Sequence, residues 1–180
     1  NLSDNNLIDY FTLSANTGVD NCMVLDQPNT IYTQTANITP LVSPCINITA
    51  ENVTFDGEGN WISNMALEGI GVYSNSSNTS VKNTNMSLAM GGGNSNALIY
   101  FKGSNNSLIL NNSLNNGTIG VIFLNSHNSS IINNSLSSNN GEGIYLTNSN
   151  NNSLYNNSVL LTLYGIYLST ANLNNLINKL

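Results

Sequence analysis

Short runs of alternating apolar and polar residues recur along the chain at a nearly constant spacing. The segment 143–146, Gly-Ile-Tyr-Leu, returns 22 residues later at 165–168. Counting back in the same steps gives Val-Ile-Phe-Leu at 121–124 and Ile-Tyr-Phe-Lys at 99–102. Such alternation is typical of β-strands. A repeat of this length is typical of a solenoid, in which each repeat buries its apolar face only against its neighbours.

Two further apolar columns accompany this phrase within each repeat. The first stands just before an asparagine and comprises Leu110, Ile132, Tyr155 and Ile177, at steps of 22, 23 and 22 residues. The second comprises Leu114, Leu136 and Val159. Three short strands separated by polar turns describe one coil of a parallel β-helix. We therefore predict an all-β solenoid of about six coils, each of 22–28 residues.

Constant register places equivalent residues of successive coils directly above one another, so that their side chains form columns. Aligned on the repeated phrase, one such column is aromatic: Phe101, Phe123, Tyr145 and Tyr167. Three interpretations of this column stay open. The rings form a binding face for sugars or another protein, an outward ladder that stabilises the strands, or part of the core.

A second column consists of asparagines: Asn111, Asn133, Asn156 and Asn178. We expect their side-chain amides to hydrogen-bond from coil to coil and to support the turn. The alternative is that they face solvent as glycosylation sequons.

The composition is unusual, with 39 Asn, 23 Ser and 14 Thr making up 76 of the 180 residues. A polar chain with so little charge suggests disorder, but 40% of the residues are hydrophobic and they stand at fixed positions in each repeat. An ordered solenoid with polar turns satisfies both facts. The net charge of −6 and the absence of Arg argue against nucleic-acid and anionic-membrane partners. We predict no membrane span, because no run of 18 apolar residues exists.

Two features suggest an extracellular protein. Cys22 and Cys45 either form a disulfide, worth about 3 kcal/mol by loop closure, or remain two buried thiols. Fourteen Asn-x-Ser/Thr sequons occur in the chain. Stacked coils leave too little room for glycans on every rung, so we select eight candidate N-glycosylation sites: Asn37, Asn75, Asn78, Asn85, Asn105, Asn116, Asn128 and Asn151.

Two segments carry a family resemblance: CMVLDQPNTIYTQ at 22–34 and CINITAENVTFDGEG at 45–59. They resemble the opening of NosD-type right-handed parallel β-helix domains, relatives of the pectin-lyase-like fold that are common in secreted and surface proteins. The Gly-Ile-Tyr-Leu and Asn-Asn phrases are similar to the repeats of that family. The resemblance covers residues 20–180 and implies a right-handed helix. It also implies an N-terminal cap at 20–45, joined to the first coil by the two cysteines, and coils at 46–180.

Residues 1–19 lie outside the resemblance and form an N-terminal extension. Within it, the segment 7–13 reads as a strand that caps its own chain or contacts a neighbouring subunit.

The catalytic groups that the resemblance implies for enzymes of this fold are missing. Those enzymes use an acidic calcium cluster with a basic residue, or several aspartates on adjacent coils, whereas this chain has no Arg. Its best acidic cluster is Asp56 and Glu58 with Glu68 nearby, which reads as a glycine-containing turn rather than a calcium or acid–base site. We expect His127 to be solvated in a polar turn. We therefore predict no enzymatic activity, no metal and no cofactor.

The last coil ends without a polar cap, so we expect either a longer β-helix or a covering subunit. The predicted function is that of an extracellular, glycosylated surface protein that associates head to tail into a filament, sheath or surface layer. The alternative is a carbohydrate-binding or carbohydrate-processing β-helix module of a larger surface protein, with glycans as partners.

Overall fold

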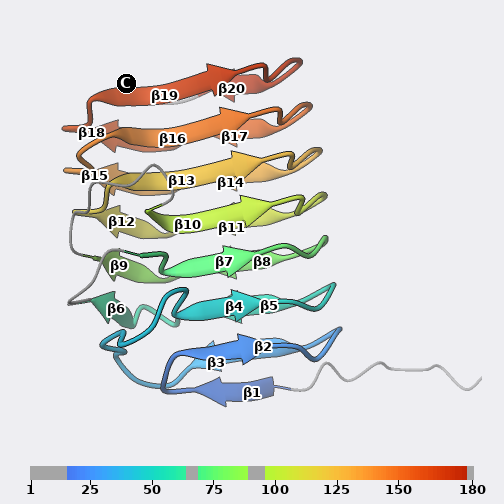
Figure 1. Ribbon diagram of the computed structural model, residues 1–180, viewed down its shortest axis with the longest axis vertical. Helices are drawn as coiled ribbons and strands as arrows, with labels where there is room; N and C mark the ends of the chain where they lie inside the picture. The colour runs from blue at the N-terminus through green and yellow to red at the C-terminus, as the bar shows by residue number, and fades with distance from the viewer. Residues whose placement is uncertain (1–15, 64–68, 89–95, 178–180) are drawn as a thin grey trace, which may run out of the picture.

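The chain is wound into a parallel β-solenoid (Figure 1). The computed structural model describes residues 16–63, 69–88 and 96–177, which contain twenty short strands and no helix. Every strand pair is parallel, and the strands of one coil stack on those of the next (Figure 1). The predicted all-β parallel β-helix is therefore confirmed.

Three parallel sheets, here called A, B and C, run along the solenoid. In each coil the chain passes through sheet B first, then sheet A and then sheet C. Sheet B contains β2 (Met23–Leu25), β4 (Ile46–Ile48), β7 (Val72–Ser74), β10 (Ala97–Lys102), β13 (Ile119–Leu124), β16 (Glu142–Thr147) and β19 (Tyr164–Ser169). Sheet A contains β1 (Asn16–Val19), β3 (Ile31–Gln34), β5 (Thr54–Asp56), β8 (Ser80–Lys82), β11 (Leu108–Leu110), β14 (Ser130–Ile132), β17 (Ser153–Tyr155) and β20 (Asn175–Ile177). Sheet C contains β6 (Trp61–Ser63), β9 (Asn85–Ser87), β12 (Ser113–Asn115), β15 (Ser135–Ser137) and β18 (Ser158–Leu160).

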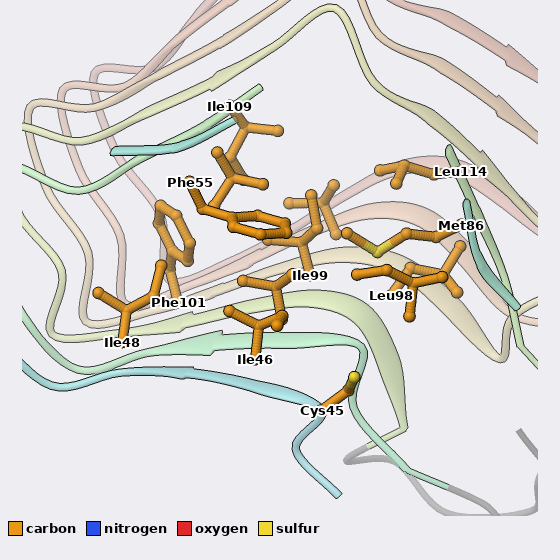
Figure 2. Packing of buried hydrophobic residues seen from close by; sticks show 14 of the residues in the cluster. Cys45, Ile46, Ile48, Phe55, Met86, Leu98, Ile99, Phe101, Ile109 and Leu114 are labelled. Carbon is orange, nitrogen blue, oxygen red and sulfur yellow. The ribbon is translucent and has the colours of Figure 1, made fainter. Parts of the chain in front are cut away.

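The core lies inside the three sheets and is built from columns of apolar side chains (Figure 2). Most strands of sheets A and C are three residues long and point only their middle residue inward, as Ile109 and Leu114 do. The longer strands of sheet B contribute more, as β10 does with Leu98, Ile99 and Phe101. The rings of Phe101 and Phe123 stack with centroids 5.5 Å apart and planes 7° apart. Each coil thus buries its apolar face mainly against the coils beside it.

The predicted aromatic column is wrong, because the register shifts by one residue between two coils. Val121 pairs with Ile144, so Ile122 lies beneath Tyr145 and Phe123 beneath Leu146. Phe101 and Phe123 point into the core, where both are fully buried. Tyr145 and Tyr167 belong to the neighbouring column, which faces outward.

The shift originates in one additional residue close to a corner. Gly117 and Asn139 are still 22 residues apart where they contact each other, whereas the paired residues Val121 and Ile144 are separated by 23. The Gly141 N–H still donates to Thr118 O in the 22-residue register, so the extra residue lies between Gly141 and Ile144, at the start of β16. Because side chains alternate along a strand, a shift of one residue exchanges the inner and outer faces.

Two equivalent glycines allow sheets B and C to approach each other at this corner. A Cβ on Gly120 would lie 2.5 Å from Leu136 Cδ2, and one on Gly143 would lie 2.2 Å from Val159 Cγ1. Any side chain here would push the sheet C residue out of the core.

The N-terminal boundary differs from the predicted one. Residues 16–19, assigned to the extension, form β1 and pair with β3 in sheet A. Within the predicted cap, β2 and β3 pair in register with β4 and β5, so residues 20–45 form a coil of the solenoid. The strand predicted at 7–13 lies outside the described residues.

The corrected register makes a direct prediction about stability. Replacing Phe123 by Ala should lower the free energy of unfolding by about 3–5 kcal/mol, because the substitution leaves a cavity in the core. Tyr145→Ala should cost at most about 1.5 kcal/mol, the scale of an aromatic pair on a surface. Urea unfolding of both variants measures the difference. Equal losses would contradict the assigned faces.

Candidate functional site

The turns of the solenoid explain why the chain is so rich in asparagine. Eighteen described residues other than glycine have a positive φ, and thirteen of them are Asn. The left-handed conformation is costly for most L-residues, but Asn adopts it readily. These residues stack at the corners, as Asn111, Asn133 and Asn156 do with φ of 55°, 56° and 53°.

The predicted asparagine ladder is only partly correct. Asn111, Asn133 and Asn156 are the left-handed corner residues, and they lie at the surface. Asn156 Nδ2 does donate a hydrogen bond to Asn133 Oδ1 over 2.7 Å, so one link of the expected ladder exists. Asn178 lies outside the described residues.

The buried ladder is formed by the second residue of each Asn-Asn pair: Asn112, Asn134 and Asn157. The Asn112 N–H donates to Asn134 Oδ1 over 2.9 Å, and the Asn134 N–H donates to Asn157 Oδ1 over 3.0 Å. Each side-chain Nδ2 also donates to a backbone carbonyl of the preceding coil, for example Asn134 Nδ2 to Ile109 O over 3.0 Å. The ladder therefore satisfies polar backbone groups that the turn buries.

A second corner carries an equivalent ladder of mixed residues. Its members, one in each successive coil, are Thr79, Ser107, Ser129, Asn152 and Asn174. The backbone N–H of each of the first four donates a hydrogen bond of 2.8–3.0 Å to the side-chain oxygen of the next member. Ser, Thr and Asn are interchangeable here because each offers one short oxygen acceptor. The sequence signal for both ladders is a small polar residue directly after a left-handed residue, which is Asn at every position except Leu173.

Cys22 and Cys45 form a disulfide, which confirms the predicted pair. Cys22 precedes β2 and Cys45 precedes β4, so the bond joins two neighbouring coils of sheet B. Disulfides persist in oxidising compartments. The bond therefore indicates an oxidising environment for this chain.

The candidate glycosylation sites all lie at or near the surface. Six of them are exposed: Asn37, Asn75, Asn78, Asn116, Asn128 and Asn151. Asn85 and Asn105 are half-buried, and their side chains are engaged with Gly59 O and the His127 N–H. Glycosylation of these sites stays a prediction.

The acidic residues of the first coils form a structural contact. Asp56 Oδ2 lies 2.8 Å from Lys82 Nζ, and Asp56 Oδ1 accepts hydrogen bonds from Asn83 Nδ2 and the Glu58 N–H. Burial raises the pKa of the Asp56 carboxyl, but these donors outweigh it and hold the pKa below its ordinary value. The carboxylate is thus occupied in fixing the turn, and Glu68 lies outside the described residues.

His127 is half-buried rather than solvated. Its ring Nδ1 accepts a hydrogen bond from the Asn150 N–H over 3.0 Å, and its backbone N–H donates to Asn105 Oδ1 over 2.7 Å. The imidazole therefore links neighbouring coils at a corner. Within the described residues, no group of three or more His, Cys, Asp and Glu side chains is placed to hold a metal ion.

A row of tyrosines replaces the predicted aromatic column on the outer face of sheet B. Tyr73 and Tyr100 pack edge to face at 5.6 Å, and burial together with the neighbouring Tyr73 raises the pKa of Tyr100. Further along the solenoid, Tyr145 and Tyr167 are 5.3 Å apart, and Tyr164 is 5.7 Å from Tyr167. Tyr164 and Tyr167 are the exposed members of the row.

The last coil exposes side chains that belong to the core columns. Leu146 and Leu154 are fully buried, whereas Leu168 and Leu176, directly above them, are 39% and 41% exposed. Among the described residues, these two side chains are thus less covered than their equivalents in the preceding coil. Among the residues that the structure describes, no helix is long and apolar enough to cross a membrane.

Comparison with known proteins identifies the fold family alone. The family model for the right-handed β-helix region matches residues 46–179, which is more than half of the chain. A search of curated proteins and a search of solved structures found no match.

The buried ladder makes a second prediction. Asn134→Ala should lower the free energy of unfolding by about 2–4 kcal/mol, because it leaves buried backbone groups of two coils without partners. Asn133→Gly, one residue earlier, should cost less than about 1 kcal/mol because glycine accepts the left-handed conformation. Chemical unfolding of both variants measures the two losses of stability. A larger loss for Asn133→Gly than for Asn134→Ala would contradict the assignment of the buried ladder to Asn134.

Proposed function

The chain belongs to the family of right-handed β-helix regions, and we propose that it uses this fold as a structural, non-catalytic protein of the cell surface. It stacks end to end with copies of itself through the exposed last coil. The observation that carries this proposal is the half-exposed core at that coil, formed by Leu168 and Leu176. Covering these side chains with another coil removes apolar surface from water and pairs the edges of β19 and β20.

The opposite end offers a matching surface. One core column runs through sheet B from Met23 in β2 to Ile166 in β19. Met23 is 37% exposed at its end of the column. A second copy placed with β2 above β19 would continue the apolar column from one molecule into the next.

The geometry of such a contact favours a filament. The two ends are different surfaces, so the contact is heterologous, and translation along the solenoid axis does not close into a ring. Head-to-tail stacking would therefore repeat without limit. This supports the filament, sheath or surface layer that the sequence predicts.

The surface setting rests on the disulfide and the exposed sequons. The Cys22–Cys45 bond indicates an oxidising compartment, which is the setting in which N-glycosylation occurs. Glycans at exposed corner residues such as Asn128 and Asn151 would project sideways and leave the end surfaces free.

The stacking proposal predicts the effect of a charge at the open end. Leu168→Glu should abolish assembly, because it buries an unpaired carboxylate in the contact. Tyr155→Glu is the matched control: Tyr155 is comparably exposed but lies on the outer side of sheet A, and its variant should assemble like the wild type. Electron microscopy and sedimentation velocity measure assembly. Monomeric wild-type protein at all concentrations, or filaments unaffected by Leu168→Glu, would contradict the proposal.

A second candidate function is glycan binding by the tyrosines at the end of sheet B. Tyr145, Tyr164 and Tyr167 lie within 5.3–5.7 Å of one another in successive pairs, and stacked aromatic rings provide a platform for the apolar faces of sugars. The negative net charge favours neutral over acidic sugars.

Titration with neutral oligosaccharides tests this candidate. Saturable binding that is lost in Tyr167→Ala and kept in Tyr155→Ala would support it. Absence of binding would leave the structural function alone.

A further inference from the structure

The turn from sheet B to sheet A carries another ladder, which stops one coil early. It runs along Ser104, Ser126 and Ser149, each placed directly after a left-handed residue at the end of a sheet B strand. The Ser104 N–H donates to Ser126 Oγ over 3.2 Å, and the Ser126 N–H donates to Ser149 Oγ over 3.0 Å. In each case the N–H of one coil is held by the hydroxyl of the next.

The next position in this series is an alanine. Asn148 N donates to Ser169 O, which places Thr170 above Asn148 and Ala171 above Ser149. Asn148 and Thr170 share the left-handed conformation, with φ of 49° and 50°. Ala171 has no side-chain oxygen, and within the described residues the Ser149 N–H has no hydrogen-bond acceptor. The ladder is therefore broken directly after Asn148.

We propose that this break makes Asn148 a site of spontaneous deamidation, while intact ladders protect the asparagines at equivalent corners. In this reaction the backbone nitrogen of the following residue, Ser149, attacks the side-chain Cγ of Asn148. A five-membered succinimide ring forms and the side-chain nitrogen leaves as ammonia. Water then opens the ring to aspartate or isoaspartate, so the net change is amide plus water to carboxylic acid plus ammonia.

The attacking atom is the one that the ladders hold. A backbone N–H engaged in a hydrogen bond must release its partner before its nitrogen can lose a proton and bend toward the side chain. Breaking that bond inside a buried turn leaves an acceptor unsatisfied, which adds to the barrier. At Ser149, no such bond has to be broken.

The preceding coil provides a natural comparison. Asn125 and Asn148 are both exposed, have φ of 52° and 49°, and are both followed by a buried serine. They differ in the state of the following N–H, since that of Ser126 is bonded to Ser149 Oγ.

One further contact favours reaction at Asn148. The Thr170 hydroxyl lies against Asn148 Oδ1, the oxygen that gains negative charge as the ring closes. A hydroxyl at this position stabilises such charge.

Peptide mapping by mass spectrometry tests the proposal on the whole folded protein, incubated at mildly alkaline pH. In the wild type we expect Asn148 to deamidate at least about fivefold faster than Asn125, the factor that one neutral hydrogen bond supplies. In urea, where no ladder exists, the two Asn-Ser sites should react at similar rates.

Two variants change which backbone N–H of this ladder lacks an acceptor. Ala171→Ser restores an acceptor above Ser149 and should slow deamidation of Asn148 to the rate at Asn125. Ser149→Ala removes the acceptor above Ser126 and should raise the rate at Asn125, even if it also lowers stability. Equal rates at Asn125 and Asn148 in the folded wild type, no detectable reaction at Asn148, or an unchanged Asn148 rate in Ala171→Ser would each overturn the proposal.

Discussion

The solenoid depends on one interaction at its corners, in which a backbone N–H of one coil donates to a side-chain oxygen of the next. The strands are mostly three residues long, so much of each coil is turn. Without a partner, each buried amide of a turn would cost about 1–3 kcal/mol of stability. The Asn112–Asn134–Asn157 ladder and its serine equivalents supply those partners. The same bonds fix each coil at a constant height above the last.

This constraint accounts for the composition of the chain. A corner needs one residue that accepts the left-handed conformation and a following residue that carries a small polar group inward. Asn meets both needs, which is why the Asn-Asn phrase recurs; Ser meets the second need alone. Charged side chains are too long and too costly to bury at such a position. A chain built on this plan is polar and weakly charged, yet fully ordered.

The repeat spacing was enough to predict the fold, because periodic apolar columns have few other structural solutions. It was not enough to assign faces. Aligning the Gly-Ile-Tyr-Leu phrase placed Phe123 with Tyr145, whereas the backbone pairs Phe123 with Leu146. The two alignments differ by one extra residue at the start of β16, and both are equally apolar. The asparagine ladder was misplaced for a similar reason: Asn133 and Asn134 are chemically identical, and only backbone geometry separates the exposed one from the buried one.

The disulfide has a mechanical consequence. Hydrogen bonds between strands run along the solenoid axis, so tension applied along that axis pulls directly on the bonds between coils. Neighbouring coils are otherwise joined covalently only by the chain that runs from one coil into the next. Between β2 and β4, however, the Cys22–Cys45 bond ties the two coils covalently at the start of both strands. A load transmitted through the molecule would therefore part the later coils while this junction stays closed.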